Sequence, residues 1–346
     1  MAGPEARVLL FNNDILKLYI ETMAKKKMAI EMDPHVRLYL RAEPGPKDVT
    51  LELRSEAGAS LLELSGKIVV KEPNYVLDWP LRGKVDGVAF AAVRVSDGTE
   101  PAWERNILIR NHTVSGRLVG FPGQILGGRS YVLAYGPEME VVGAAKTDEK
   151  GRFSLSLPEG RYAAIAGATT EVETKTLQSW MWGPRVDRNL ELTLRIGEIC
   201  FARMTASLTP ERSLIVHCVP HSIYHSYLLP LNANEYLGDM ATPEVRAKPE
   251  YYPKLSAEGI ELFLDSTKLE VWAVWQIDSC LADYGRGDLA RPALMLEAHV
   301  PRRLLDRPDH MVRIVGNSTS SAPDRGDITE RGEAWCWVET PLAWAI

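Results

Sequence analysis

Three of the seven histidines of this 346-residue chain lie within nine residues, in the pattern His217-Cys218-x-x-His221-x-x-x-His225. Neutral imidazole binds zinc, copper and nickel, and a three-histidine site with one open coordination position can activate water. His217, His221 and His225 are therefore candidate ligands for a transition metal, the one cofactor that the sequence suggests. A second interpretation stays open. His221 and His225 share a face only if a helical turn follows Pro220; otherwise His217 is a sandwich residue and the other two belong to a surface loop.

Two pairs of tryptophans have the spacing that a strand converts into an aromatic face. Trp180 with Trp182, and Trp335 with Trp337, are two residues apart, so each pair projects from one side of a strand. Aromatic faces of β-sandwiches can stack on sugar rings or form protein interfaces. These four residues are candidate ligand-binding residues; the alternative is that they fill cores and contacts between domains.

A third pair and a tyrosine-rich segment extend this aromatic set. Trp272 and Trp275 are three residues apart and would point to opposite faces of a regular strand, unless a bulge intervenes. Tyr251 and Tyr252 lie in a stretch from residue 230 to 254 that contains four prolines. A structureless stretch of that length is usually a functional or packing loop, which makes both tyrosines candidate ligand-binding residues.

Motifs for specific catalysis are weak. Asp278, Asp283 and Asp288 are close enough in sequence to share a loop, but a glycosidase needs two carboxylates opposed across a cleft. The chain contains no nucleophile elbow, phosphate-binding loop, dinucleotide fingerprint or His-Glu-x-x-His motif. The sequence therefore leaves open whether the protein is an enzyme.

Composition excludes two classes of partner. A net charge of −6 without clustered Lys or Arg gives no electrostatic footprint for nucleic acid. No apolar stretch approaches the roughly 18 residues that a membrane span requires. The first residues do not resemble a signal peptide, so we expect an extracellular or cell-surface location if a signal has been removed, and otherwise a cytoplasmic one. The four cysteines, all in the last 150 residues, are expected to be buried thiols, with one or two disulfide bridges as the alternative.

The elements that must position these residues are predicted to be strands almost throughout. Short β-branched runs alternate apolar and polar residues and recur about every ten residues between Gly, Pro and Asp clusters, as in Val36–Leu40 and Val49–Arg54. Only residues 14–26 also fit a helical period, and strand is preferred there because Tyr19, Ile20 and Thr22 favour β-structure. The prediction is an all-β protein of tandem antiparallel β-sandwich domains, covering residues 1–108, 109–197 and 198–346.

The middle segment has a recognisable pattern. It opens with Val114-x-Gly116 and continues with Thr147-Asp148-x-x-Gly151-x-Phe153-x-Leu155-x-Leu157 and then Gly160-x-Tyr162. Asp148 and Gly151 suit a tight turn with a side-chain cap and a positive φ, after which the three apolar residues point to one face. This segment resembles the carboxypeptidase regulatory-like, transthyretin-like domain. The resemblance implies a structural or presentation module and no catalytic residue.

The last segment resembles an immunoglobulin-like domain in architecture only, because the Cys and Trp spacing of true immunoglobulin domains is not convincingly present. The leading hypothesis is a non-enzymatic structural, self-assembling or ligand-binding protein, with carbohydrate or a second copy as partner. The competing hypothesis is a metal- or carboxylate-dependent hydrolase or lyase that acts on carbohydrate, with its site in the C-terminal segment.

Overall fold

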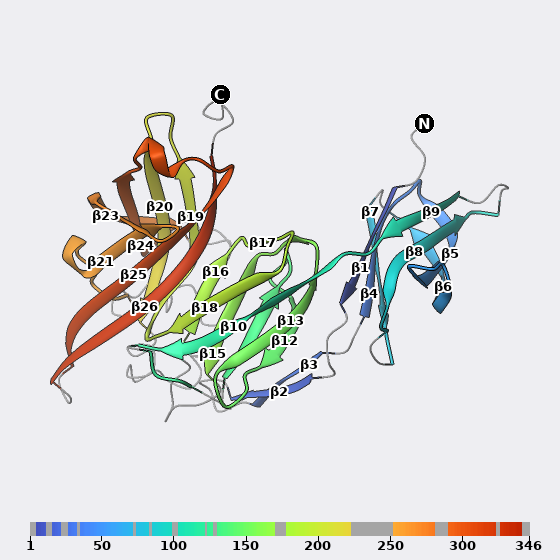
Figure 1. Cartoon of the computed structure of the whole chain (residues 1–346), viewed down its shortest axis with the longest axis horizontal. Coiled ribbons are helices and arrows are strands. Elements are labelled where there is room, and N and C mark those ends of the chain that lie inside the picture. Colours follow the sequence, from blue (N-terminus) through green and yellow to red (C-terminus); the bar gives the residue numbers. More distant parts are fainter. Residues whose placement is uncertain are drawn as a thin grey trace.

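The computed structural model shows an all-β protein (Figure 1). It describes residues 5–11, 16–21, 27–32, 35–71, 74–82, 85–98, 103–121, 123–126, 130–169, 178–222, 252–280, 290–322 and 326–340. The predicted fold class is confirmed. The helices among these residues are two short 3-10 turns, η3 (Ala257–Gly259) and η5 (Arg302–Leu304), and neither is long enough to cross a membrane.

The N-terminal sandwich packs a three-stranded sheet, in the order β1-β4-β7, against a four-stranded sheet, in the order β6-β5-β8-β9. The strands are β1 (Glu5–Phe11), β4 (His35–Arg41), β5 (Gly45–Ser55), β6 (Ser60–Val70), β7 (Asn74–Pro80), β8 (Val88–Ser96) and β9 (Trp103–Leu108). The alternation that predicted these strands is visible in their burial: Val36, Leu38 and Leu40 of β4 are buried, and the residues between them are partly exposed. One core lies between the two sheets.

Residues 16–21, the described part of the segment that also fitted a helical period, form a strand. This strand, β2 (Leu16–Glu21), pairs with β3 (Lys27–Met32) in antiparallel register, with Glu21 opposite Lys27. Of the three consecutive lysines 25–27, only Lys27 lies within the described residues.

The middle sandwich has a three-stranded sheet, in the order β13-β10-β18, that faces β12-β11-β15-β16. Its strands are β10 (Asn111–Gly120), β11 (Ser130–Tyr135), β12 (Val141–Lys146), β13 (Arg152–Pro158), β14 (Gly160–Arg161), β15 (Ala164–Thr169), β16 (Gln178–Trp182), β17 (Arg185–Val186) and β18 (Leu190–Ile196). β10 and β18 pair in parallel, and β14 pairs with β17 in a separate two-stranded ribbon.

The turn at Asp148 has the predicted geometry. The Asp148 carboxylate accepts hydrogen bonds from the backbone N–H groups of Lys150 (2.9 Å) and Arg152 (2.8 Å), and Gly151 has a φ of +71°. Only glycine fits well there, since a Cβ would also lie 2.6 Å from the carbonyl oxygen of Leu118. Phe153, Leu155 and Leu157 are buried in the middle core, as the alternating pattern predicted.

The C-terminal sandwich packs β19-β20-β24-β23 against β26-β25-β21-β22. Its strands are β19 (Ile199–Leu208), β20 (Ser213–Ser222), β21 (Ile260–Leu264), β22 (Thr267–Leu269), β23 (Val271–Cys280), β24 (Ala290–His299), β25 (Asp309–Ala322) and β26 (Gly326–Glu339). The pattern of residues 259–275 is that of a single hairpin, but their strands belong to two different sheets. Leu269 packs on the core from β22 in one sheet, and Val271 packs on the same core from β23 in the other sheet. The chain therefore passes from one sheet to the other between these two residues.

The middle and C-terminal sandwiches share one eight-stranded sheet, in the order β12-β11-β15-β16-β26-β25-β21-β22. β16 and β26 join the two halves in parallel register, with Met181 beside Trp335 and Trp182 beside Cys336. Consecutive strand residues project to opposite sides, so Met181 packs in the middle core and Trp182 packs on the C-terminal core. In the middle half of the shared sheet, the face that carries Met181 is covered by β13-β10-β18. In the C-terminal half, the opposite face, which carries Trp182, is covered by β19-β20-β24-β23.

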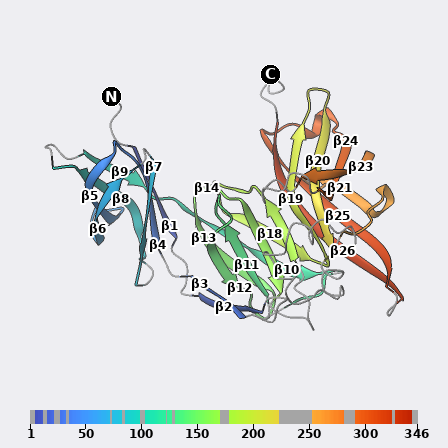
Figure 2. The ribbon, with the colours of Figure 1, turned by 180° about the vertical axis from the view of Figure 1, so that it is seen from behind.

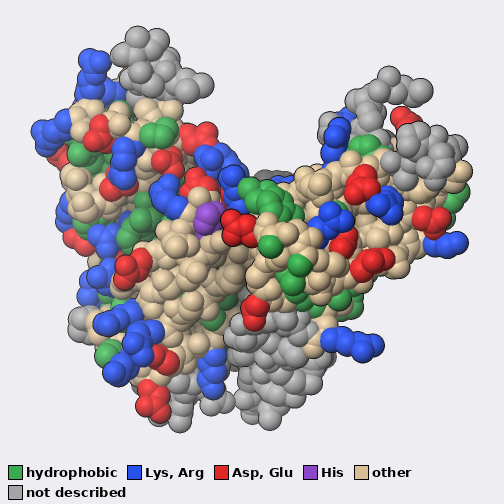
Figure 3. Space-filling model, turned by 45° about the vertical axis from the view of Figure 1, so that its right-hand side comes forward, with side chains coloured by type: hydrophobic (Ala, Val, Ile, Leu, Met, Phe, Trp, Pro, Cys, Tyr) green, Lys and Arg blue, Asp and Glu red, His purple; other side chains and the backbone are tan. Residues whose placement is uncertain are grey.

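The three cores follow one another along the long axis of the molecule (Figures 1 and 2). Figure 3 shows that the surface is hollowed between the two end sandwiches. We propose the boundaries 1–108, 109–197 and 198–346 for the three domains, because the buried residues of each core fall within one of these ranges, except Ile109, which packs in the N-terminal core.

Candidate functional site

A β-bulge in the edge strand β23 places two tryptophans on the outer face of the C-terminal sheet. The register between β23 and β24 shifts between Val271 and Ala273, so that Val271 faces Ala298, Ala273 faces Glu297 and Trp275 faces Met295. Val271 and Val274 both pack on the core, which leaves Trp275 on the opposite side. The indoles of Trp272 and Trp275 are 60% and 40% exposed, the largest exposed aromatic side chains of the described residues. The bulge that two tryptophans three residues apart need in order to share one face of a strand is therefore present.

The residues beside these tryptophans follow from the strand registers. Trp275 lies beside Met295 of β24, which lies beside His217 of β20. One pair further along, Ala273 lies beside Glu297, and Glu297 lies beside Ile215. Neighbouring strands are about 4.8 Å apart, so these rows form one continuous surface about 10 Å across.

Trp272 also has a defined orientation. Its indole stacks on the imidazole of His299 with ring centroids 5.3 Å apart and only 3° between the planes. The exposed side of the indole therefore presents a flat face to solvent rather than an edge. We call the surface formed by Trp272, Trp275, Met295, Glu297, His299, His217 and Ile215 the outer aromatic face.

The other end of the same sheet face is covered. Tyr252 is buried against Val219 and Ala293, and its ring lies 5.1 Å from that of His221. Tyr252, predicted as a ligand-binding residue, therefore packs on the sheet, whereas Tyr251 and most of the proline- and tyrosine-rich stretch lie outside the described residues.

Two of the three candidate metal ligands lie in one strand. This strand, β20, continues past Pro220 to Ser222. Its pairing with β24 ends at Cys218, so Pro220, which lacks an N–H, needs partners only on the β19 side. His217 and His221 are therefore separated by four residues of extended chain, about 13 Å between their Cα atoms. They cannot bind the same ion at that separation. His225 lies outside the described residues, so the metal prediction as a whole stays a prediction.

The described residues contain no group of three His, Cys, Asp or Glu side chains that could hold a metal ion. The side chains of Asp278, Asp283 and Asp288 are not among those described, so the carboxylate hypothesis also stays a prediction. Cys200, Cys218 and Cys336 are free thiols, and Cys218 and Cys336 are buried. Burial raises the pKa of Cys218 to about 12.

The two tryptophan pairs with strand spacing lie on the neighbouring strands β16 and β26 at the join between the sandwiches, on opposite faces of the shared sheet. Trp180 and Trp182 stack with ring centroids 4.9 Å apart, and Trp182 Nε1–H donates to the carbonyl oxygen of Phe201 at 2.8 Å. Trp335 packs on the middle core from the other face of the sheet. All four residues, Trp337 included, are only partly exposed. Each pair projects to one face as predicted, and Trp182 and Trp335 contact the core of the neighbouring sandwich.

A buried carboxylate lies beside this join. Glu333 accepts hydrogen bonds from Trp335 Nε1 (3.0 Å) and from the guanidinium groups of Arg195 and Arg313 (3.3 Å each). Burial raises the pKa of Glu333 in spite of the two guanidinium groups. Because Arg195 belongs to β18 and Arg313 to β25, this carboxylate connects the two sandwiches.

Met295, Glu297 and His299 of the outer aromatic face were not identified from the sequence. Their alternation in β24 marks a strand, but only the register with β20 and β23 shows that they lie beside His217 and the tryptophans. Local patterns carry no signal for that register.

Comparison with known proteins gives no family. No protein-family profile and no curated protein matches the sequence. Solved structures with some likeness include a DUF3823 family protein from Bacteroides ovatus ATCC 8483 (11% identity, 66% of this chain and 99% of the other, TM-score 0.23). Another DUF3823 family protein, from Parabacteroides merdae ATCC 43184, is 13% identical over 60% and 90% of the two chains, with a TM-score of 0.20. The group B streptococcus pilus 2b backbone protein is 8% identical over 56% and 98%, with a TM-score of 0.19. Scores this low carry no argument about domain arrangement or function.

Proposed function

We propose that this protein is a non-catalytic carbohydrate-binding protein whose outer aromatic face stacks on the sugar rings of a glycan. The observation that carries the proposal is the pair Trp272 and Trp275, which a bulge brings to one face of the sheet with 60% and 40% of their side chains exposed. Large aromatic side chains in such positions are typical of binding surfaces rather than of an ordinary solvated surface.

The chemistry of the neighbouring side chains favours a sugar. A pyranose ring has C–H groups that pack against an indole face and hydroxyl groups that need hydrogen-bond partners at the edge of the contact. Glu297, beside Ala273, supplies hydrogen-bond acceptors. His299 stacks on Trp272 and His217 lies beside Met295, and both supply ring nitrogen atoms for hydrogen bonds. A protein partner would bury a wider apolar area, but Glu297 lies in the middle of this face and is costly to bury without a counter-charge.

The rest of the molecule provides a rigid support for this face. The shared eight-stranded sheet fixes the C-terminal sandwich to the middle sandwich. The middle sandwich would then act as a spacer, which is the role that its resemblance to carboxypeptidase regulatory-like domains implies.

The test is binding to an array of polysaccharides, followed by titration of the best ligand against intrinsic tryptophan fluorescence. A sugar that covers one face of Trp272 removes about 75 Å² from water, worth about 2 kcal/mol. We therefore expect Trp272→Ala to weaken binding about 25-fold, with a similar but smaller effect for Trp275→Ala.

Val69→Ala is the matched control, since Val69 is 57% exposed in the N-terminal sandwich. Binding that survives in the Trp272→Ala, Trp275→Ala double variant would overturn the proposal, as would an array without any bound glycan. A concentration-dependent mass in light scattering that is lost in the double variant would instead identify a second copy as the partner.

A further inference from the structure

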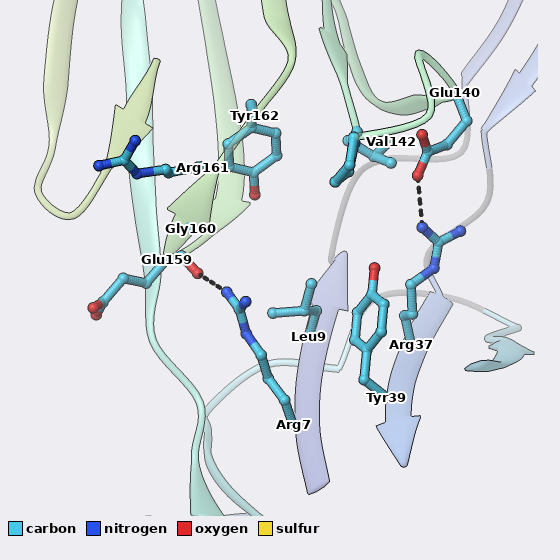
Figure 4. A pocket seen from close by; sticks show the side chains of 12 residues that line it. Arg7, Leu9, Arg37, Tyr39, Glu140, Val142, Glu159, Gly160, Arg161 and Tyr162 are labelled. Atoms are coloured by element: carbon cyan, nitrogen blue, oxygen red, sulfur yellow. Dashed lines mark hydrogen bonds and ion pairs between the residues drawn. The ribbon is translucent and has the colours of Figure 1, made fainter. Parts of the chain in front are cut away.

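A cavity of about 190 Å³ lies between the N-terminal and middle sandwiches (Figure 4). One wall comes from β1 and β4, which contribute Leu9 and Tyr39. The opposite wall comes from the middle sandwich and includes Val142 and Tyr162. Two aliphatic side chains and two phenol rings thus supply the apolar part of the lining, and three arginines and two glutamates supply its charged part.

The phenol groups are held in place. Tyr162 donates a hydrogen bond to the carbonyl oxygen of Pro158 at 2.7 Å, and burial raises the pKa of Tyr162 well above its usual value, so the hydroxyl stays neutral. Figure 4 shows the hydroxyl of Tyr39 directed between Leu9 and Arg37. Hydrogen bonds therefore orient both phenol groups, that of Tyr162 through Pro158 and that of Tyr39 through Arg37.

Both carboxylates of the lining have an arginine partner, and one of these arginines is shared with a further carboxylate. Glu140 accepts a hydrogen bond from Arg37 Nη1 at 2.8 Å, while Nε and Nη2 of Arg37 bind Asp78 at 2.8 and 3.1 Å. The carboxylate of Glu159 lies 3.5 Å from Arg110 and points away from the cavity in Figure 4.

One guanidinium group of the lining is not neutralised. Arg7 Nη2 donates to the backbone carbonyl oxygen of Glu159 at 2.9 Å, and within the described part of the chain Arg7 forms no ion pair with a carboxylate. Arg161, the other arginine near the opening, pairs with Glu339. Because Arg37 is shared between Glu140 and Asp78, its wall keeps one excess negative charge. Arg7, at the opposite end of the cavity in Figure 4, carries a positive charge without a carboxylate partner among the described residues.

We propose that this cavity binds a small carboxylic acid as its anion, with the carboxylate on Arg7 and the hydrocarbon part between Leu9, Val142 and the two tyrosine rings. A planar carboxylate matches the fork of a guanidinium group and requires only one positive charge. Because the two walls belong to different sandwiches, the ligand would contact both and hold them together.

The experiment is ligand-observed NMR and calorimetric titration of the full chain with sodium benzoate, with benzamide as the uncharged analogue of the same shape. We expect benzoate to bind and benzamide to bind at least tenfold more weakly. Arg7→Gln should weaken benzoate binding about tenfold, because one charge-assisted pair is lost. Arg94→Gln is the control, since Arg94 pairs with Glu104 elsewhere in the N-terminal sandwich.

A second variant separates loss of charge from loss of structure. Leu9→Phe fills the cavity and keeps Arg7, and should also abolish benzoate binding while the unfolding temperature stays within a few degrees of wild type. Equal affinity for benzoate and benzamide, unchanged binding in Arg7→Gln, or no benzoate binding at all would each overturn the proposal. This site and the outer aromatic face share no residue, so either proposal can fail without the other.

Discussion

Replacing Gly332 with alanine tests whether the middle and C-terminal sandwiches form one cooperative unit. Gly332 lies in β26 where this strand crosses β19, and a Cβ at this position would be 1.9 Å from the carbonyl oxygen of Ile199. Ordinary contact begins at 3.4 Å, so the two backbones must separate by about 1.5 Å. No side-chain rotation can relieve the clash, because the neighbouring atoms are backbone.

We expect this substitution to cost about 3 kcal/mol, the upper end for overpacking. For a unit of about 230 residues each kcal/mol lowers the midpoint by roughly 2–4 °C, so the expected fall is roughly 6–12 °C. Gly66→Ala is the matched control, since its Cβ would meet only Trp79 Nε1 at 3.9 Å. We expect that control to stay within about 1 kcal/mol of wild type.

Differential scanning calorimetry provides the assay. In Gly332→Ala, one transition that contains both the middle and C-terminal sandwiches should move to lower temperature, while the N-terminal transition stays in place. A C-terminal transition that moves alone would refute the reasoning, because it would show that the shared sheet does not couple the two cores. An unchanged midpoint would refute the close approach of β19 and β26 itself.

Two further measurements test the C-terminal core. Asp265 has a φ of +54° and accepts hydrogen bonds from His310 Nδ1 (2.9 Å) and the Met311 N–H (3.0 Å); although burial opposes it, these bonds and Arg307 lower the pKa of Asp265. The ionised Asp265 therefore adds to the free energy of unfolding. This stabilisation is fully present above the pKa of about 3.9 that an Asp has in the unfolded chain, and it is lost as the pH falls through the lower pKa of Asp265 in the folded protein. Chemical denaturation should therefore show less loss of stability between pH 5 and pH 2 in Asp265→Asn than in wild type, and an identical pH dependence would contradict the assignment. Burial raises the pKa of Cys218 to about 12 and also raises the pKa of Cys336. Peptide mapping after treatment with iodoacetamide at pH 8 should therefore find both thiols unmodified in the native protein and modified in guanidinium. Rapid labelling of the native protein would show instead that the two thiols are accessible.

Features that depend on neighbouring residues could be predicted from the sequence. The alternation in Val36–Leu40 and the turn from Asp148 to Gly151 are local, because side-chain direction and φ are set within a few residues. The same holds for Trp180 and Trp182, whose spacing places both rings on one face. These expectations match the structure for that reason.

Features that depend on strand partners could not be predicted. The pairing of Met181 with Trp335 joins residues 154 positions apart, and nothing in either strand specifies the other. The cavity has the same origin, since Arg7 and Tyr162 meet only once two separate cores have docked. The change of sheet between Leu269 and Val271 is also non-local, because the apolar pattern is the same whether both residues face one sheet or two.

The bulge in β23 brings two tryptophans to the face of the sheet that a stacking ligand would use. β23 is the outermost strand of its sheet, and the register shift lies at its start, between Val271 and Ala273, where it turns Trp272 to the outer face. From Ala273 to Cys280 the pairing with β24 is regular, so the outer edge of β23 keeps a row of backbone groups to which another chain can add. Stacking on Trp272 and strand addition at this edge thus use different groups of the same strand. The Trp272→Ala variant separates them, because it removes the indole and leaves the backbone row in place.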